Sequence, residues 1–392
     1  IAGVAKHSMK TASSPDGKQT ATADEHGVHL LDAASGKRTH TLEESIHHGI
    51  TFLTWSPDGR SLALTPDGSL RVMEASTGWR LPLAGSEYRA AAWSPDGKIF
   101  ATTKGHEVFL LDTISSRVIR RLEGSINSAT EVAWSADGKR LAGVGYFSVH
   151  VWSTETGKQL WQKDKRAFRA AWSPDGRRLA STDDDLKGVV RIWEAETGKL
   201  LHEVPLQSQA LAWSPDGKTL LAGPADQGEA PLIDADSGTV RFKLTEGVRH
   251  LQCVRWSPDG KTFVTLSNEG LLRVWDAANG AARRTVQLPG VLDFILSAAW
   301  SPDGQMLAWE NGCAIHLNDN DGHPLGVLLP FDAFGRLAVT ADGRYRGNAR
   351  VERAIRMVVQ KKDGTTETLT PREFEQKYGF QNDFDKVRLI DK

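Results

Sequence analysis

The chain has 392 residues, a formal net charge of −1 and 25% charged residues, a balance that argues against a partner held by bulk charge, such as a nucleic-acid backbone. Its two cysteines, Cys253 and Cys313, provide neither a disulfide framework nor a paired-cysteine zinc site, and we expect both to be free, buried thiols. No apolar run approaches the roughly 18 residues of a membrane-spanning helix.

One six-residue phrase recurs along the chain. Trp-Ser-Pro-Asp-Gly, followed by Lys, Arg or Gln, starts at six positions: Trp55, Trp93, Trp172, Trp213, Trp256 and Trp300. A variant with Ala in place of Pro starts at Trp134, and a first copy without Trp runs from Ser13 to Lys18. The Asp residues of successive copies lie 38 to 44 residues apart. A period near forty indicates a repeat architecture.

Each repeat is predicted to be a four-stranded antiparallel sheet. Pro fixes φ at the second position of a type I turn, Asp suits the third, and Gly accepts the left-handed conformation that follows. In the repeat around Trp213, this turn joins a strand at 210–213 to one at 219–222. The preceding repeat shows a third strand at 190–194, a second Gly turn at 196–198 and a fourth strand at 199–203. Strands joined by such short turns must be neighbours in the sheet.

One such sheet cannot bury both of its faces, so the copies must stack around an axis as a propeller. We therefore expect an all-β protein with eight blades over residues 1–331, and a ring of nine blades is the alternative. The Trp before each turn is expected to pack as a wedge between adjacent blades. The repeats occupy roughly 5–43, 44–84, 85–124, 125–163, 164–204, 205–246, 247–289 and 290–331.

These motifs resemble those of WD40-repeat β-propeller proteins. The family's terminal Trp-Asp pair is intact at Trp275-Asp276 and nearly so at Trp193-Glu194. The Gly-His dipeptide that the family places before the first strand of each blade is essentially missing: Glu123-Gly124-Ser125 and Glu246-Gly247-Val248 stand there instead. We therefore expect the family's buried His–Ser/Thr–Asp–Trp network to be incomplete in most blades. The many Ser-Pro-Asp-Gly turns look like those of bacterial members of the family.

Residues 332–392 are predicted to form a degenerate ninth repeat and a C-terminal extension packed on the propeller. Asp342-Gly343 is a worn copy of the turn on the same period, and residues 355–359 fall where a third strand belongs. Thr370-Pro371-Arg372-Glu373 reads as a capping box with Pro at the first helical position. A short helix is expected from there to about Tyr378, ended by Gly379.

No motif for catalysis, a cofactor or a metal stands out. Gly217-Lys218-Thr219 lacks the first Gly of a phosphate-binding loop and belongs to a repeat turn. Residues 318–322 have the letters of a calcium loop but not its register, so we expect a turn. The acidic run Asp183 to Asp185 is expected to be a solvated loop tip.

Candidate partner-binding residues lie on the loops between second and third strands and on those that lead into first strands. In a propeller these loops crowd one rim around the central channel, where the resemblance implies that partners dock. Aromatic and Arg side chains are over-represented at interface hot spots. These types occur at Tyr88, Arg89, Tyr146, Phe147, Arg166, Phe168, Arg169, Arg249 and His250.

The first functional hypothesis is a non-enzymatic scaffold or sensor that binds a protein or peptide through this rim. The resemblance implies that it is part of a larger bacterial signalling or defence protein. Because a closed ring leaves no obligatory edge for self-association, we expect the propeller to be monomeric. The alternatives are an enzyme with its active site at the channel mouth and a nucleic-acid-binding propeller that uses Arg166, Arg169 and Arg249. No signal peptide is visible, so we expect a cytoplasmic protein; a chain that starts at Ile1 is expected to have lost part of its N-terminus.

Overall fold

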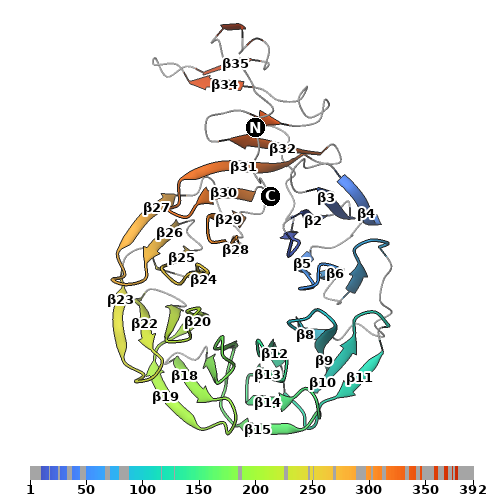
Figure 1. Cartoon of the computed structure of the whole chain (residues 1–392), viewed down its shortest axis with the longest axis vertical. Coiled ribbons are helices and arrows are strands. Elements are labelled where there is room, and N and C mark those ends of the chain that lie inside the picture. The colour runs from blue at the N-terminus through green and yellow to red at the C-terminus, as the bar shows by residue number, and fades with distance from the viewer. Residues whose placement is uncertain are drawn as a thin grey trace.

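The computed structural model arranges the repeats as eight blades around a central axis (Figure 1). Six blades are four-stranded sheets in the described part, blade 2 has three strands there, and blade 8 belongs to a six-stranded sheet. The structure describes residues 10–16, 18–24, 27–32, 38–44, 50–66, 71–78, 88–115, 117–127, 129–183, 188–224, 228–245, 248–249, 251–267, 271–287, 297–301, 303–310, 315–331, 335–340, 345–346, 357–360, 366–369, 373 and 376–377.

In the residues that the structure describes, β1 to β31 follow one another along the chain without an intervening helix. Blades 1 to 4 consist of β1 (Lys10–Ser13), β2 (Gln19–Asp24), β3 (Gly27–Asp32), β4 (Arg38–Glu44), β5 (Ile50–Trp55), β6 (Ser61–Pro66), β7 (Arg71–Glu74), β8 (Tyr88–Trp93), β9 (Ile99–Lys104), β10 (Glu107–Asp112), β11 (Val118–Arg121), β12 (Ala129–Trp134), β13 (Arg140–Gly145), β14 (Val149–Ser153) and β15 (Gln159–Lys163). Blades 5 to 8 consist of β16 (Arg169–Trp172), β17 (Arg178–Thr182), β18 (Val189–Glu194), β19 (Leu200–Pro205), β20 (Ser208–Trp213), β21 (Thr219–Pro224), β22 (Ala230–Asp234), β23 (Val240–Leu244), β24 (Leu251–Trp256), β25 (Thr262–Ser267), β26 (Leu271–Asp276), β27 (Ala282–Gln287), β28 (Ser297–Trp300), β29 (Met306–Glu310), β30 (Ile315–Asp319) and β31 (Pro324–Phe331).

Within each blade, consecutive strands pair antiparallel, with the first strand nearest the axis and the last at the periphery (Figure 1). A β-bulge interrupts the pairing of third and fourth strands at equivalent places, for example between Ile192 and Trp193 and between Val274 and Trp275. Bulges increase the local twist, as a radial stack of blades requires. The predicted all-β, eight-bladed fold is confirmed.

The Ser-Pro-Asp-Gly turn has the predicted geometry. In blade 6, the N–H of Gly217 donates to the carbonyl of Ser214 at 2.9 Å, and Gly217 adopts a φ of 70°. The Ser214 hydroxyl donates to Asp216 Oδ1 at 2.6 Å, and the N–H of Lys218 donates to the same oxygen at 3.0 Å. These hydrogen bonds, that of Ser214 first, lower the pKa of Asp216. Each such turn is therefore closed by its own side chains.

Much of the apolar core packs between blades. Trp213 of blade 6 lies in one cluster with Ala180 and Ile192 of blade 5, and the other Trp residues before the turns occupy equivalent places. The predicted wedge role is thus confirmed. At six junctions the indole also donates a hydrogen bond to the preceding blade. The acceptor is the backbone carbonyl just before the residue that occupies the same place in that blade's repeat, as Ala171 does before Trp172. These bonds are Trp55 to Ala12, Trp134 to Ala92, Trp172 to Ala133, Trp213 to Ala171, Trp256 to Ala212 and Trp300 to Arg255.

The family's buried polar network survives in part. In blades 5 and 7, the third-strand Trp donates to a second-strand hydroxyl: Trp193 to Ser181 at 2.9 Å and Trp275 to Thr265 at 2.8 Å. In blade 4, Trp152 donates instead to the backbone carbonyl of Glu123 at 2.7 Å. The Trp–hydroxyl half of the network therefore does not need the missing Gly-His dipeptide.

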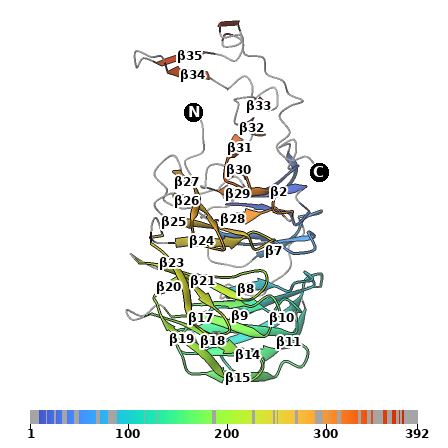
Figure 2. The ribbon, with the colours of Figure 1, turned by 60° about the vertical axis from the view of Figure 1, so that its left-hand side comes forward.

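The tail does not build a ninth blade from its described strands. β32 (Gly335–Thr340) pairs with the outer edge of β31, and β33 (Tyr345–Arg346) pairs with β32, which extends the sheet of blade 8. β34 (Met357–Gln360) and β35 (Thr366–Leu369) form a separate two-stranded sheet, which lies beyond the ring in both views (Figures 1 and 2). Glu373, Gln376 and Lys377 are helical, within the expected C-terminal helix.

Candidate functional site

The meander gives the ring two different faces. Antiparallel strands reverse direction at each turn, so the Ser-Pro-Asp-Gly turns and the third-to-fourth turns lie on one face, here called the turn face. The second-to-third connections and those leading into each first strand lie on the other, here called the loop face. The residues predicted to bind a partner all come from the loop face.

Two consecutive aromatic residues project from the loop face of blade 4. The N–H of Gly145 donates to the carbonyl of Ser148 at 3.1 Å, so Tyr146 and Phe147 are the central residues of a two-residue hairpin turn. Tyr146 is 41% exposed and Phe147 is 63% exposed. Among the described residues they are the two exposed aromatic side chains.

The connection from β15 to β16 brings three more predicted residues beside them. The guanidinium carbon of Arg166 lies 5.1 Å from the centre of the Tyr146 ring, and that of Arg169 lies 5.1 Å from the centre of the Phe168 ring. Such distances are typical of cation–π contacts. We call Tyr146, Phe147, Arg166, Phe168 and Arg169 the rim cluster.

Backbone hydrogen bonds hold this connection in place. The N–H of Ala167 donates to the carbonyl of Gly145 at 3.0 Å, which ties the connection to the hairpin that carries the aromatic turn. The Thr130 hydroxyl lies 3.1 Å from the carbonyl of Phe168 and can donate to it. Two hydrogen bonds to blade 4 therefore position the connection that carries part of the rim cluster.

Ser148, His150 and Gln159 form a hydrogen-bonded chain, similar in order to a catalytic triad, at the base of the hairpin. Ser148 Oγ lies 2.7 Å from His150 Nε2, and His150 Nδ1 lies 3.0 Å from Gln159 Oε1. A hydroxyl, an imidazole and an orienting group in this order also occur in nucleophilic catalysis. Here Ser148 and His150 are both buried, and the imidazole stacks on Trp152 with ring centres 5.2 Å apart. Burial lowers the pKa of His150. The arrangement fixes the base of the aromatic turn.

Glu131 lies next to the rim cluster on the inner strand β12. Its Oε2 accepts the N–H of Ala170 at 2.8 Å, which links the inner strands of blades 4 and 5. Burial raises the pKa of Glu131, while the Ala170 hydrogen bond and the charge of Arg169 oppose that rise. The Glu131 carboxylate thus has a structural role at the junction of blades 4 and 5.

The other predicted partner-binding residues lie on other blades. Tyr88 and Arg89 begin β8 in blade 3, and their side chains are outside the described residues. Arg249 is exposed ahead of β24 in blade 7, two blades beyond blade 5, and His250 is outside the described residues. Among the predicted partner-binding residues that the structure describes, side-chain contacts join Arg166 to Tyr146 and Arg169 to Phe168, and Phe147 follows Tyr146 in the same turn.

The expectation that Asp183 belongs to a solvated loop tip is wrong. Its carboxylate is buried and lies 3.0 Å from Arg191 Nη1, and it also accepts the N–H of Val189 at 2.9 Å. Arg191 Nε lies 3.0 Å from Glu203 Oε2 on the neighbouring strand. The signal was an Arg in the apolar third strand, since buried charges require partners. Asp184 and Asp185 lie outside the described residues.

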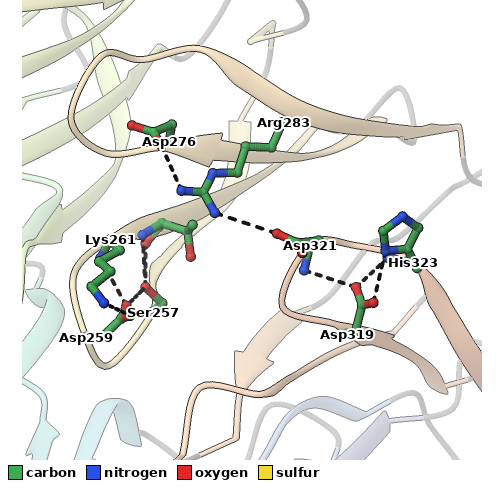
Figure 3. Close-up of polar contacts among 9 residues, drawn as sticks. Ser257, Asp259, Lys261, Asp276, Arg283, Asp319, Asp321 and His323 are labelled. Carbon is green, nitrogen blue, oxygen red and sulfur yellow. Dashed lines mark hydrogen bonds and ion pairs between the residues drawn. The ribbon is translucent and has the colours of Figure 1, made fainter.

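On the turn face, a hollow of about 430 Å³ lies between blades 6 and 7, lined by Arg241, Lys261, Asp276 and Arg283, among others. Figure 3 shows how its polar side chains are paired. Arg283 lies 2.7 Å from Asp276 and 3.6 Å from Asp321 of blade 8, and Lys261 Nζ lies 3.8 Å from Asp259. Lys261 and Arg283 are thus paired with carboxylates, and Arg241 donates to the Thr219 hydroxyl at 3.2 Å, so the hollow gives no basis for proposing a charged ligand.

Residues 318–322, whose composition resembles a calcium-binding loop, form a turn, as predicted. The N–H of Gly322 donates to the carbonyl of Asp319 at 3.0 Å, and the Asp319 carboxylate accepts the N–H groups of Asp321 and His323 (Figure 3). The described part of the chain contains no group of three or more side chains placed to hold a metal ion. Nor does it contain a helix long and apolar enough to cross a membrane.

Residues 243–276 match the family model described as "WD domain, G-beta repeat". The matched segment runs from the end of β23 through β26 and stops at the intact pair Trp275-Asp276. No curated protein matches the chain. One repeat of this eight-bladed propeller thus matches the WD40 family model, and the other blades are antiparallel meanders of the same order around the axis.

Proposed function

We propose that this propeller is a non-enzymatic scaffold that binds a protein or peptide through the rim cluster on its loop face. The observation that carries the proposal is the turn Tyr146-Phe147, which presents two exposed aromatic side chains, with Arg166 against the Tyr146 ring. Aromatic and Arg side chains supply much of the binding energy at protein interfaces. WD40 propellers commonly serve as protein-interaction scaffolds, which agrees with this reading.

The rigidity of the surface supports the proposal. The Ser148–His150–Gln159 arrangement fixes one end of the aromatic turn, and the bond from Ala167 to Gly145 fixes the connection beside it. A surface that is ordered before binding loses less conformational entropy when a partner docks. Exposed aromatic side chains on a rigid base are therefore suited to anchoring a partner.

The setting we propose is a larger bacterial signalling or defence protein, in which the propeller is the monomeric recognition part. The basis is the resemblance of its Ser-Pro-Asp-Gly-rich repeats to bacterial members of the family. Purification of the full-length protein from its host, followed by identification of the domains in the same polypeptide, would test this setting directly. Recovery of the propeller without any effector domain in the same polypeptide would contradict it.

The experiment for the docking surface compares two double variants in a pull-down from native lysate. Tyr146→Ser/Phe147→Ser removes the exposed aromatic pair of the loop face. Ile114→Ser/Val118→Ser is the matched control, because those side chains are 73% and 57% exposed and lie on the turn face. Circular dichroism and the melting temperature first establish that both variants fold as the wild type does.

We expect a partner that the wild type and the Ile114/Val118 variant retain and the Tyr146/Phe147 variant loses. A photo-cross-linking residue at position 147 should then couple to that partner, whereas one at position 114 should not. Equal recovery with both variants would contradict the assignment of the docking surface to the rim cluster.

A further inference from the structure

The connection that carries the rim cluster is strongly cationic. Between residues 163 and 169 it holds Lys163, Lys165, Arg166 and Arg169 against a single carboxylate, Asp164. Lys165 and both Arg residues are exposed. In a chain whose net charge is −1, this is a local excess of positive charge beside exposed aromatic rings.

The loop-face cations of neighbouring blades are arranged differently. Arg121 of blade 3 pairs with Glu107, and Lys243 of blade 6 pairs with Glu229. Arg191 of blade 5 is buried between Asp183 and Glu203. On those blades, a carboxylate of the same blade already neutralises the cation.

Arg169 has no such ion pair among the described residues. Glu131, the nearby carboxylate, accepts the N–H of Ala170 instead, and its charge is disfavoured by burial. Asp164 Oδ1 accepts from Gln162 Nε2 at 3.1 Å. The charge of Arg169 opposes the rise in the pKa of Glu131, but the two side chains form no ion pair in the described part of the chain.

The contact of Arg169 with Phe168 uses no hydrogen-bond acceptor. The guanidinium carbon of Arg169 lies over the Phe168 ring, 5.1 Å from its centre, and the side chain is exposed. The N–H donors in the guanidinium plane form the paired hydrogen bonds that Arg makes to carboxylates. Phe147, which is 63% exposed, offers an apolar contact on the same surface.

We propose that the partner of the rim cluster presents an acidic segment, with a carboxylate bound by Arg169 and an apolar side chain packed on Phe147. This inference rests on the proposed function, because it names the partner class of the same surface. The charge of the segment complements the connection between β15 and β16, and the aromatic turn supplies the anchor.

The test selects peptides from a displayed random library on the immobilised full chain. Synthetic copies of the enriched peptides are then measured by fluorescence anisotropy at low and high salt. Three proteins are compared with the wild type: Arg169→Gln, Tyr146→Ser/Phe147→Ser, and Arg117→Gln as the matched control on the turn face. Arg169→Gln keeps a hydrogen-bonding side chain and removes only the charge and the paired donors.

We expect the enriched peptides to be richer in Asp and Glu than the input library. Their affinity should fall by about tenfold or more in Arg169→Gln, the scale of a lost charge-assisted contact, and should fall with salt. Arg117→Gln should bind as the wild type does.

The outcomes that overturn the inference are distinct from those that overturn the proposed function. Neutral or basic peptides that are lost in the Tyr146/Phe147 variant would exclude an acidic partner and leave the docking surface in place. Peptides that bind both variants unchanged would exclude the surface itself, and so would a library that yields no binder. A single-stranded oligonucleotide that displaces the peptides more strongly than free acidic peptide would replace the inference with nucleic-acid binding.

Discussion

The indole Nε1 of Trp213 donates a 3.0 Å hydrogen bond to the backbone carbonyl of Ala171, which belongs to the inner strand of the preceding blade. The same bond recurs at five other junctions, so it joins neighbouring blades at equivalent points. The junction of blades 2 and 3 differs. There the Nε1 of Trp93 is buried without a hydrogen-bond partner among the described residues, and the ring packs edge-on against Phe100 of its own blade.

Replacing Trp213 by Phe should destabilise the protein by about 1–2 kcal/mol more than replacing Trp93 by Phe. Both changes remove the same atoms, but only the first breaks a hydrogen bond and leaves the Ala171 carbonyl without its donor. Urea unfolding of the two variants and the wild type would measure the difference. Equal losses of unfolding free energy would contradict the assigned role of the indole bond.

The junction of blades 2 and 3 also has the smallest described core, with Ala63, Val72, Phe100 and Leu111 as its buried cluster. We therefore expect this junction to open first. Hydrogen exchange should show the amides of β8 and β9 exchanging faster than those of β20 and β21, which lie at a junction with the indole bond. The opposite order would contradict the inference that this junction is weak.

Most of the fold could be predicted because each repeat contains a recognisable turn sequence. The Ser-Pro-Asp-Gly phrase sets the turn type, and the apolar strands on both sides set the sheet, so eight copies determine eight blades. The tail was harder. The strand at 335–340 was foreseeable as local structure, but its pairing with β31 depends on an exposed sheet edge that only the folded ring provides.

The residue types of the candidate site and the loops that carry them could be predicted, but the contacts between these residues could not. Tyr146 and Arg166 lie 20 residues apart in the sequence, and the contact between them depends on the blade geometry that brings the two loops together. Asp183 was misread because its partner, Arg191, sits on the next strand in a position that the apolar pattern hides. The sequence shows which residues share a loop. To predict an ion pair between strands, one must also know the register in which the strands pair.

Arg191→Met should destabilise the protein by about 3–5 kcal/mol, since it leaves the buried carboxylate of Asp183 without its cation. Asp183→Asn in the same chain should restore part of the loss, because it removes the unpaired charge. Glu203→Gln is the control, since Glu203 is 44% exposed and its pair with Arg191 should contribute less than about 1 kcal/mol. Thermal or urea unfolding measures all three. A loss for Glu203→Gln as large as that for Arg191→Met would contradict a stabilising role centred on Asp183.

Stability should fall in mild acid because of His316. Burial lowers the pKa of His316 from 6.5 to about 4, and its ring stacks on Trp309 with centres 3.7 Å apart. The unfolded chain binds the proton first, so the stabilisation present above pH 6.5 is lost as the pH falls from there towards 4. The slope for this one group is at most about 1.4 kcal/mol per pH unit.

His316→Phe keeps an aromatic ring against Trp309 and removes the proton-binding group. Its unfolding free energy should therefore fall less steeply with acid between pH 6.5 and 4 than that of the wild type. His150, whose pKa burial also lowers, contributes to the remaining slope, so the His150→Phe variant and the double variant complete the comparison. Parallel pH profiles for the wild type and His316→Phe would contradict the assignment.

The side-chain bonds within the Ser-Pro-Asp-Gly turns predict a second acid effect at lower pH. The hydrogen bond from Ser214 is the largest cause that lowers the pKa of Asp216, so the folded protein favours the ionised carboxylate. Its contribution is present above the ordinary Asp pKa of 3.8 and is lost as the pH falls through the lower value of the folded state. Asp216→Asn should therefore destabilise the protein at neutral pH by less than about 1 kcal/mol, because water screens an exposed charge, and by still less in strong acid. Glu155→Gln, which removes the same charge from an exposed turn position, is the control and should change stability little at either pH. A cost of Asp216→Asn that did not shrink with acid would mean that the turn is held by its backbone and by Gly217, and that the carboxylate adds nothing.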